Sequence, residues 1–410
     1  MSPGPFPPET QTQVDGLETA DIVVVVPACG TVEGVRTAAE ATRSGAPNLR
    51  AVIVHPQTVD DPDAVKGPAG SAVLQALPCR LPGVSGLPLT TEDARMLFRQ
   101  MSVVGGQVGA RAFALVGGLP EGILPATIHA LLHPVLESQF DLVLPSYARH
   151  TFDGLINRGL VYPLTRALFG KRANGQLGID FGFSTRMMSG LFDRDNGRGQ
   201  GPPIWLLTEA LERNFQVCEA HVGTFLPPVE ADDDLSAAIA RVLGSLFEDM
   251  DRHASMWQRV RGSQPIRTFG DAAPQANEHR AIDVSTMVES FQLGFRNLQE
   301  VWARVLPPAS LIELGRLTRA PLDRFRLPDA LWARIVFDFA LGHRLRVISR
   351  DHLLRAMTPL YLAWVASFVM EVGEAGHVAA QDRLERLCLS YEAEKPYLLA
   401  RWRWPDRFSP

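Results

Sequence analysis

Asp21-Ile-Val-Val-Val-Val-Pro27 and Arg50-Ala-Val-Ile-Val54 are two short runs dominated by valine and isoleucine. Continuous apolar runs of this kind are typical of strands buried on both faces of a parallel sheet. Residues 32–43 between them have a helical pattern, which ends at Ser44-Gly45-Ala46-Pro47. A strand, a helix and a second strand in succession predict a βαβ unit, and hence a parallel sheet.

The same alternation continues to about residue 230. Val104-Gly-Gly-Gln-Val-Gly109 follows a predicted helix over 91–104 and is expected to form a turn. Beyond Asp232 the helical patterns run almost to the C-terminus. Further strands are predicted at 112–116, 140–145, 181–184 and 215–221, and late helices at 283–304, 309–318, 328–347, 350–370 and 376–402. The sequence predicts a disordered tail at 1–20, an α/β domain at 21–230 and an all-helical domain at 231–410.

Composition argues against several classes of protein. Lys and Arg number 40 against 45 Asp and Glu, which gives a net charge of -5. A nucleic-acid or anionic-membrane binder would show a basic surplus instead. No apolar run reaches the length of a membrane span, and the Pro-rich start lacks the pattern of a signal segment.

The four cysteines indicate the redox environment. They are scattered along the chain, with no Cys-x-x-Cys pair and no histidine at ligand spacing, so a zinc site or a disulfide framework is not expected. A reducing compartment fits this pattern. We therefore expect a cytoplasmic protein.

Four motifs lie close together in the middle of the chain: Tyr147-Ala-Arg-His150, Asp153-Gly-Leu-Ile156, Tyr162-Pro-Leu-Thr-Arg-Ala-Leu-Phe-Gly170 and Gly178-Ile-Asp-Phe-Gly-Phe-Ser184. This series resembles bacterial and archaeal GT-A glycosyltransferases related to mannosylglycerate synthase. The resemblance continues through Trp257–Gly262 and Asp351–Tyr361 and covers most of residues 21–404. It implies a Rossmann-like GT-A domain followed by a helical domain. The implied activity is sugar transfer from a nucleotide sugar to a small acceptor that bears a carboxylate or a hydroxyl group.

The resemblance also implies roles for individual residues. Asp180 stands where these enzymes place a carboxylate facing the sugar or the acceptor, and an aspartate there suits a base, a nucleophile or a hydroxyl anchor. The alternative is a structural aspartate that binds backbone donors in a turn. Arg149 resembles the arginine that clamps an acceptor carboxylate, with a surface ion pair as its alternative. The same substrate-binding segment keeps Tyr147, His150 and Asp153.

Tyr162 and Arg166 lie one helical turn apart. They are expected to pack and to form an ion pair inside the α/β domain.

The metal and nucleotide motifs of such enzymes are largely replaced. An Asp-x-Asp motif after the third sheet strand holds their divalent metal, but Val116-Gly-Gly-Leu-Pro-Glu-Gly122 retains Glu121 alone. Pro27 and the pair Asp60 and Asp61 remain at the positions that approach the nucleotide. We assign these four residues to cofactor binding and none as a metal ligand. Mg²⁺ or Mn²⁺ is expected to bind weakly or not at all.

Further losses leave two functions open. Gly201-Pro-Pro-Ile-Trp205 and Thr224-Phe-Leu-Pro-Pro228 lack the carboxylate and the metal-binding histidine that the family carries there. One hypothesis is an active transferase whose partners are a nucleotide sugar and a small acceptor. The other is a pseudoenzyme that binds or regulates an active paralogue. A homodimer is compatible with both, whereas nucleic acid and a membrane span are not expected.

Overall fold

The computed structural model describes residues 6–59, 61–66, 74–81, 90–191, 202–224, 234–272, 282–373 and 375–403, without the side chains of residues 62 and 63. The chain divides into two compact units. Unit 1 consists of residues 1–148, 173–232 and 266–275. Unit 2 consists of residues 149–172, 233–265 and 276–410.

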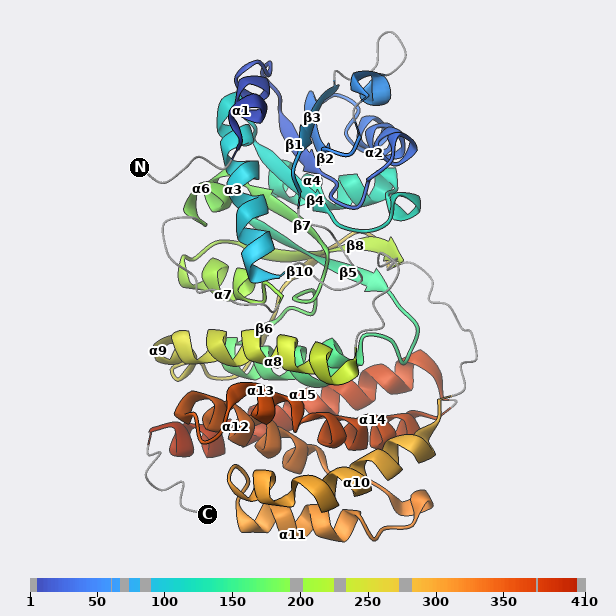
Figure 1. Ribbon diagram of the computed structural model, residues 1–410, viewed down its shortest axis with the longest axis vertical. Helices are drawn as coiled ribbons and strands as arrows, with labels where there is room; N and C mark the ends of the chain where they lie inside the picture. Colours follow the sequence, from blue (N-terminus) through green and yellow to red (C-terminus); the bar gives the residue numbers. More distant parts are fainter. Residues whose placement is uncertain are drawn as a thin grey trace. The chain divides into compact units, whose positions relative to one another are not determined.

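Unit 1 is built on a mostly parallel sheet (Figure 1), which confirms the α/β fold class. The described strands follow the order β10-β8-β5-β7-β4-β1-β2-β3. Strand β7 runs antiparallel to its neighbours β4 and β5, and the other pairs are parallel. The strand bounds are β1 Ile22–Val25, β2 Ala51–Pro56, β3 Leu74–Cys79, β4 Ala112–Val116, β5 Leu142–Ala148, β7 Asp180–Ser184, β8 Val217–Thr224 and β10 Arg267–Phe269.

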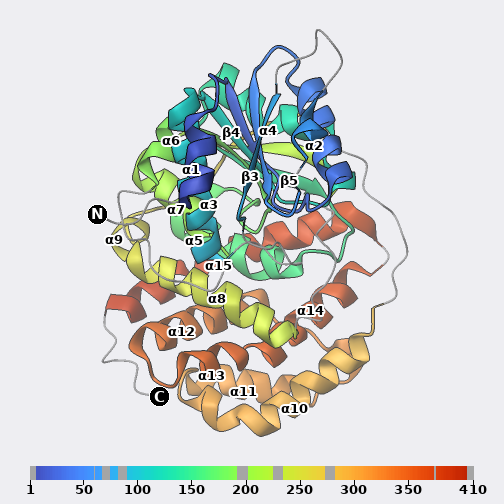
Figure 2. The same cartoon turned by 45° about the horizontal axis from the view of Figure 1, so that its top comes forward.

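Helices cover both faces of this sheet, so its central strands are buried throughout (Figure 2). Val23 and Val25 point to one face, and Ile22 and Val24 to the other, as the two-residue period of a strand requires. The first face packs against α1 Pro8–Asp15, α3 Thr91–Val108, α6 Thr185–Gly190 and α7 Trp205–Glu212. The second face packs against α2 Val32–Gly45 and α4 Pro125–Ser138.

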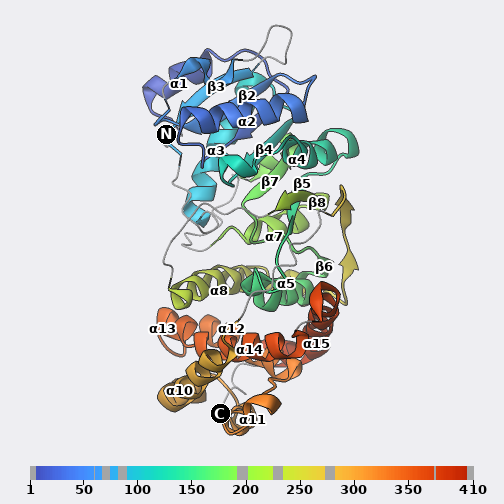
Figure 3. The same cartoon turned by 90° about the vertical axis from the view of Figure 1, so that its right-hand side faces the viewer.

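Unit 2 is mainly helical (Figure 3). Its contacts join α10 to α14, α12 to α15, α5 to α15 and α8 to α13. The short strands β6 Lys171–Arg172 and β9 Gln264–Pro265 pair with each other. The helices are η3 Asn157–Val161 (a π-helix), α5 Tyr162–Phe169, α8 Leu235–Arg252, α9 Ala254–Trp257, α10 Val284–Ala303, α11 Pro308–Leu317, α12 Asp329–Leu345, α13 Arg350–Arg355, α14 Thr358–Val372 and α15 Gly376–Arg403.

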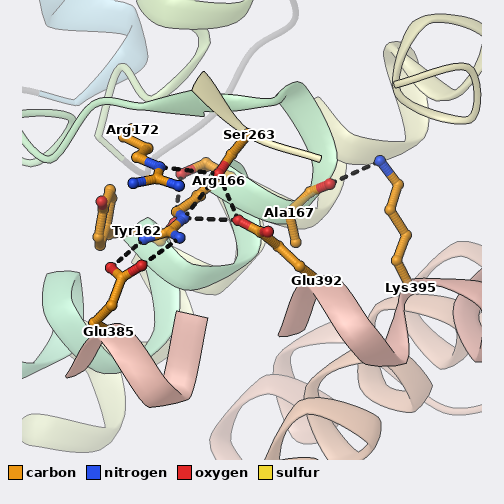
Figure 4. A network of polar contacts seen from close by, with 9 residues as sticks. Tyr162, Arg166, Ala167, Arg172, Ser263, Glu385, Glu392 and Lys395 are labelled. Atoms are coloured by element: carbon orange, nitrogen blue, oxygen red, sulfur yellow. Dashed lines mark hydrogen bonds and ion pairs between the residues drawn. The ribbon is translucent and has the colours of Figure 1, made fainter. Parts of the chain in front are cut away.

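A buried arginine fixes α5 in unit 2 (Figure 4). The Arg166 side chain is fully buried, and its guanidinium donates to Glu385 (2.5 and 2.8 Å) and to Glu392 (2.7 Å) of α15. The predicted ion pair therefore exists, but its partners belong to the helical unit and not to the α/β domain. Lys395 of α15 adds contacts to the carbonyls of Ala167 and Leu168 at the end of α5.

This network corrects the predicted division at residue 230. Residues 149–172 lie within the predicted α/β domain of 21–230 yet belong to unit 2, because Arg166 needs the carboxylates of α15. Conversely, residues 266–275 lie within the predicted helical domain of 231–410 but belong to unit 1, because β10 pairs with β8.

The tail predicted at residues 1–20 is partly ordered. Residues 8–15 form α1, and Val14 is fully buried against the first face of the sheet. Phe6 and Ala20 are buried in the same core, and the polar sequence Pro8-Glu-Thr-Gln-Thr-Gln hid this attachment. The other corrections concern element ends and edge strands. Helix α3 continues through the predicted turn to Val108 and ends at Gly109 (φ 73°), and the edge strands β3 and β10 were not foreseen.

One apolar stretch is long enough to cross a membrane by length and composition. It spans Arg350–Val372, with a mean hydropathy of 1.4 over its most apolar window. Within the described residues, 72% of that window is buried in the fold, and the stretch comprises two helices, with Pro359 at the start of the second. Burial of this degree is typical of a core helix.

Two adjacent glycines of α3 test how closely the helix packs on the sheet. A Cβ at Gly105 would overlap the buried ring of Phe113, whereas a Cβ at Gly106 would meet nothing within 4 Å. We expect Gly105→Ala to lower the free energy of unfolding by about 1–3 kcal/mol through overpacking. Gly106→Ala should raise it by about 0.5–1 kcal/mol, since alanine favours the helix. Urea denaturation of both variants measures this, and a stable Gly105→Ala protein would contradict the packing.

Candidate functional site

The predicted site residues of unit 1 lie where the sheet strands end. Strands β1, β2 and β4 are parallel, so the turns that follow them meet at one edge of the sheet. Strand β7 is antiparallel and begins at that edge, where Asp180 lies opposite Val116 of β4. In α/β sheets this edge is the usual place for a ligand.

Asp180 binds the chain itself. One carboxylate oxygen accepts a hydrogen bond from the Gly117 amide at 2.9 Å, and the Gly118 amide also donates to the carboxylate. The other oxygen accepts from the Tyr147 hydroxyl at 2.7 Å. The residue is 5% exposed, and burial raises its pKa to about 6 although these three donors oppose the shift.

Tyr147 connects this carboxylate to the start of β7. Its hydroxyl oxygen also accepts from the amides of Ile179 and Asp180, each at 3.2 Å. Gly117 completes the arrangement, because a Cβ there would lie 2.6 Å from the Ile179 carbonyl oxygen. The structure thus brings Asp180 and Tyr147 together, and it shows Asp180 bound to backbone donors, as its alternative role requires.

A second buried carboxylate at this end of unit 1 was missed in the sequence. Glu219 of β8 is 8% exposed and accepts from the amides of Asn174 and, at 3.1 Å, Gly175. Burial raises its pKa to about 7, against the effect of these two amides. The sequence feature that could have indicated this residue is a single glutamate inside the apolar run Val217-Cys-Glu-Ala220. Together Glu219 and Asp180 hold both ends of the segment 174–180.

The described residues assigned to cofactor binding lie in the turns after three different strands, β1, β2 and β4. Pro27 is buried in the turn after β1, and Glu121 is exposed in the short helix η2 (Pro120–Gly122). Burial and the charge of Glu121 raise the pKa of the Cys29 thiol to about 12. Asp61 is half-buried, and Asp60 lies outside the described residues.

These residues do not fit a divalent metal. Gly117, Gly118 and Leu119, which follow β4, carry no side-chain oxygen, and the Asp180 oxygens already accept from Gly117, Gly118 and Tyr147. Among the described residues of the segment that follows β4, Glu121 is the one carboxylate, and it is exposed, whereas Mg²⁺ and Mn²⁺ sites combine several oxygen ligands.

His55, at the end of β2, is a further residue that sequence reasoning missed. Its side chain is 1% exposed, and burial lowers its pKa, against the effect of the Pro56 carbonyl near Nδ1. Its Nε2 has no hydrogen-bond partner in the described part of the chain. Burial therefore favours the neutral form of this imidazole, which lies next to the turn that carries Asp61.

The other predicted substrate-binding residues lie in unit 2. Arg149, His150 and Asp153 share one turn, in which the Phe152 amide donates to His150 Nδ1 at 3.3 Å and the Asp153 amide to the His150 carbonyl at 3.1 Å. The Arg149 guanidinium lies beside Gly154, where a Cβ would be 2.8 Å from Nη1. Gly154 has a φ of 65°, a left-handed conformation that favours glycine at this position of the turn.

The raised pKa of Asp180 gives a test by pH. Because the folded carboxyl holds its proton more tightly than the unfolded one, the free energy of unfolding should fall as pH rises from about 4 to about 6. Asp180→Asn keeps the shape and removes the titration. We expect the stability of the native protein relative to this variant to drop by about 2 kcal/mol over that interval.

Chemical denaturation at several pH values measures this difference. Glu33→Gln, at an exposed position in the same unit, serves as the matched control. A difference between native protein and Asp180→Asn that stays constant with pH would contradict the burial of an ionisable Asp180.

No protein-family model matches the chain, and no curated protein matches it. Similar solved structures include glucosyl-3-phosphoglycerate synthase from Mycobacterium tuberculosis in complex with Mn²⁺, UDP-glucose and phosphoglyceric acid. The identity is 17% and the TM-score 0.38, over 58% of this chain and 82% of that chain. A complex of the same enzyme with UDP gives 18% and 0.39, over 61% and 86%. At TM-scores below 0.5, these likenesses define neither a family nor an activity for the chain.

Proposed function

We propose that this chain is a glycosyltransferase-like protein without metal-dependent sugar transfer, which acts by binding a ligand or a partner protein. The observation that carries this proposal is the set of hydrogen bonds that the Asp180 carboxylate accepts. Its carboxylate accepts from Gly117 and Gly118, the residues that replace the Asp-x-Asp motif of the enzymes the sequence resembles. Gly117 and Gly118 have no side chain and Leu119 has an apolar one, so this segment offers no carboxylate to a metal.

The losses along this edge support the same conclusion. A diphosphate leaving group needs positive charge as it departs, which a metal ion or cationic side chains provide. The turns after β1 and β4, Pro27–Gly30 and Gly117–Gly122, contain no lysine or arginine. A nucleotide sugar bound there would lack this stabilisation from either turn.

A second candidate is an active transferase that works without metal. It is favoured by the pKa of Asp180, which at about 6 lies close to neutrality, where a carboxyl group can both give and take a proton. In that case Asp180 acts at the sugar, and Arg149 anchors an acidic acceptor.

The compartment and the partners remain proposals. The four cysteines are buried and free, which supports a reducing compartment such as the cytoplasm. A paralogue or a second copy of the chain as partner is the expectation from sequence.

Calorimetric titration with UDP- and GDP-sugars, with and without Mn²⁺, tests the proposed function. We expect Mn²⁺ to change donor affinity less than about twofold, because one carboxylate contributes little to a divalent site. Glu121→Gln is the matched variant, since Glu121 is the carboxylate left after β4. Micromolar binding that requires Mn²⁺ and is lost in Glu121→Gln would overturn the proposal.

Release of UDP or GDP from the same donors separates the two candidates. We expect no release above that of an Asp180→Ala protein. Metal-independent release that Asp180→Ala abolishes, while Glu33→Gln retains it, would establish the transferase instead.

A further inference from the structure

Two histidines face each other on helix α4 of unit 1. His129 and His133 are four residues apart, so they project from the same side of the helix on successive turns. Their ring centroids lie 4.8 Å apart, and the ring planes are inclined by only 17°. His129 is exposed and His133 is half-buried, so solvent reaches the pair.

Packing fixes one ring of this pair. Phe269 of β10 meets the His133 ring edge to face, with centroids 6.3 Å apart and planes at 81°. Phe269 in turn contacts the ring of Phe140 at 5.4 Å. An imidazole that is already held by a neighbour loses less conformational freedom when it binds a ligand. His133 is thus the anchored member of the pair, and the exposed His129 can adjust to it.

A carboxylate lies beside the anchored ring. Glu137, one turn further along α4, places an oxygen 3.3 Å from Nδ1 of His133. The contact is not aligned as a hydrogen bond, so it acts through charge. A negative charge at Nδ1 favours the tautomer that carries its proton there, which leaves the Nε2 lone pair available to a metal ion.

The spacing of the two rings suits one transition-metal ion. Zn–N bonds are about 2.0–2.1 Å long, so two nitrogens on one ion lie at most about 4.2 Å apart. Stacked rings with centroids 4.8 Å apart reach this separation through a small rotation of the exposed ring. Imidazole nitrogen binds Zn²⁺, Ni²⁺ and Cu²⁺, whereas Mg²⁺ and Ca²⁺ prefer oxygen. Two histidines at i and i+4 on one helical face are a known arrangement for holding Zn²⁺.

We propose that His129 and His133 form a binding site for Zn²⁺ on the surface of unit 1, with water at the remaining positions of the ion. The prediction against a zinc site concerned the cysteines, and this pair contains none. The site is independent of the proposed function, because neither Asp180 nor the turns after β1 and β4 contribute to it. An ion that bridges two turns of α4 stabilises the folded unit, since the unfolded chain does not hold the two rings together.

Calorimetric titration of the full-length protein with ZnCl₂ tests the site. We expect one Zn²⁺ per chain, with a dissociation constant in the micromolar range. His129→Ala should weaken binding about tenfold or more, because it removes one of the two imidazole ligands. Saturating Zn²⁺ should also raise the urea midpoint of the native protein and leave that of His129→Ala unchanged.

Controls separate this pair from other histidines and from general attraction of cations. His352→Ala removes an exposed histidine of α13 in unit 2 and should leave Zn²⁺ affinity unchanged. Excess Mg²⁺ should not displace Zn²⁺. The proposal is overturned if the native protein binds Zn²⁺ only at millimolar concentration, if His129→Ala binds it as tightly, if His352→Ala weakens binding equally, or if Mg²⁺ displaces it. Because His129 is exposed, its replacement tests the site without disturbing the packing of His133 against Phe269.

Discussion

Two carboxylates of α15 hold the Arg166 guanidinium in the interior of unit 2, and the division of the chain depends on this contact. A buried arginine without partners would destabilise the fold by several kcal/mol, so α5 must pack where Glu385 and Glu392 are. The segment 149–172 is therefore committed to the helical unit, although strands of the sheet precede and follow it. Lys395, which donates to the carbonyls that end α5, strengthens the same attachment.

The sheet of unit 1 uses a related device at the edge where β1, β2 and β4 end. The chain leaves unit 1 after Ala148 and returns at Ala173, and two buried carboxylates fasten the returning segment. Glu219 binds the amides at its beginning, and Asp180 and Tyr147 hold its end. A carboxylate that serves the backbone in this way is withdrawn from a metal or a substrate. The backbone of the segment 174–180 and any ligand at the sheet edge thus compete for the Asp180 carboxylate.

The central strands could be predicted from the sequence because their apolar runs are continuous. Ile22–Val25 and Ala112–Val116 have no polar interruption, and the late helices also follow their patterns closely. The edge strands were not predicted, because β3 includes Gln75 and Pro78 and β10 includes Arg267. Neither strand therefore has the pattern of a buried strand. In the site, 33 residues separate Asp180 from its partner Tyr147 along the chain. The sequence marks Glu219 only as a single charged residue inside an apolar strand. The partners of Arg166 lie 219 and 226 residues away, where no local pattern reaches.

The interleaving of the two units also sets the order in which the molecule can form on the ribosome. Strand β10 follows α8 in the chain, so the sheet stays incomplete until all of α8 has been made. Helix α5 must wait longer, since Glu385 follows Arg166 by 219 residues. At about 5–20 residues per second this corresponds to roughly 10–45 s of synthesis. During that time Arg166 has to stay hydrated or find temporary partners.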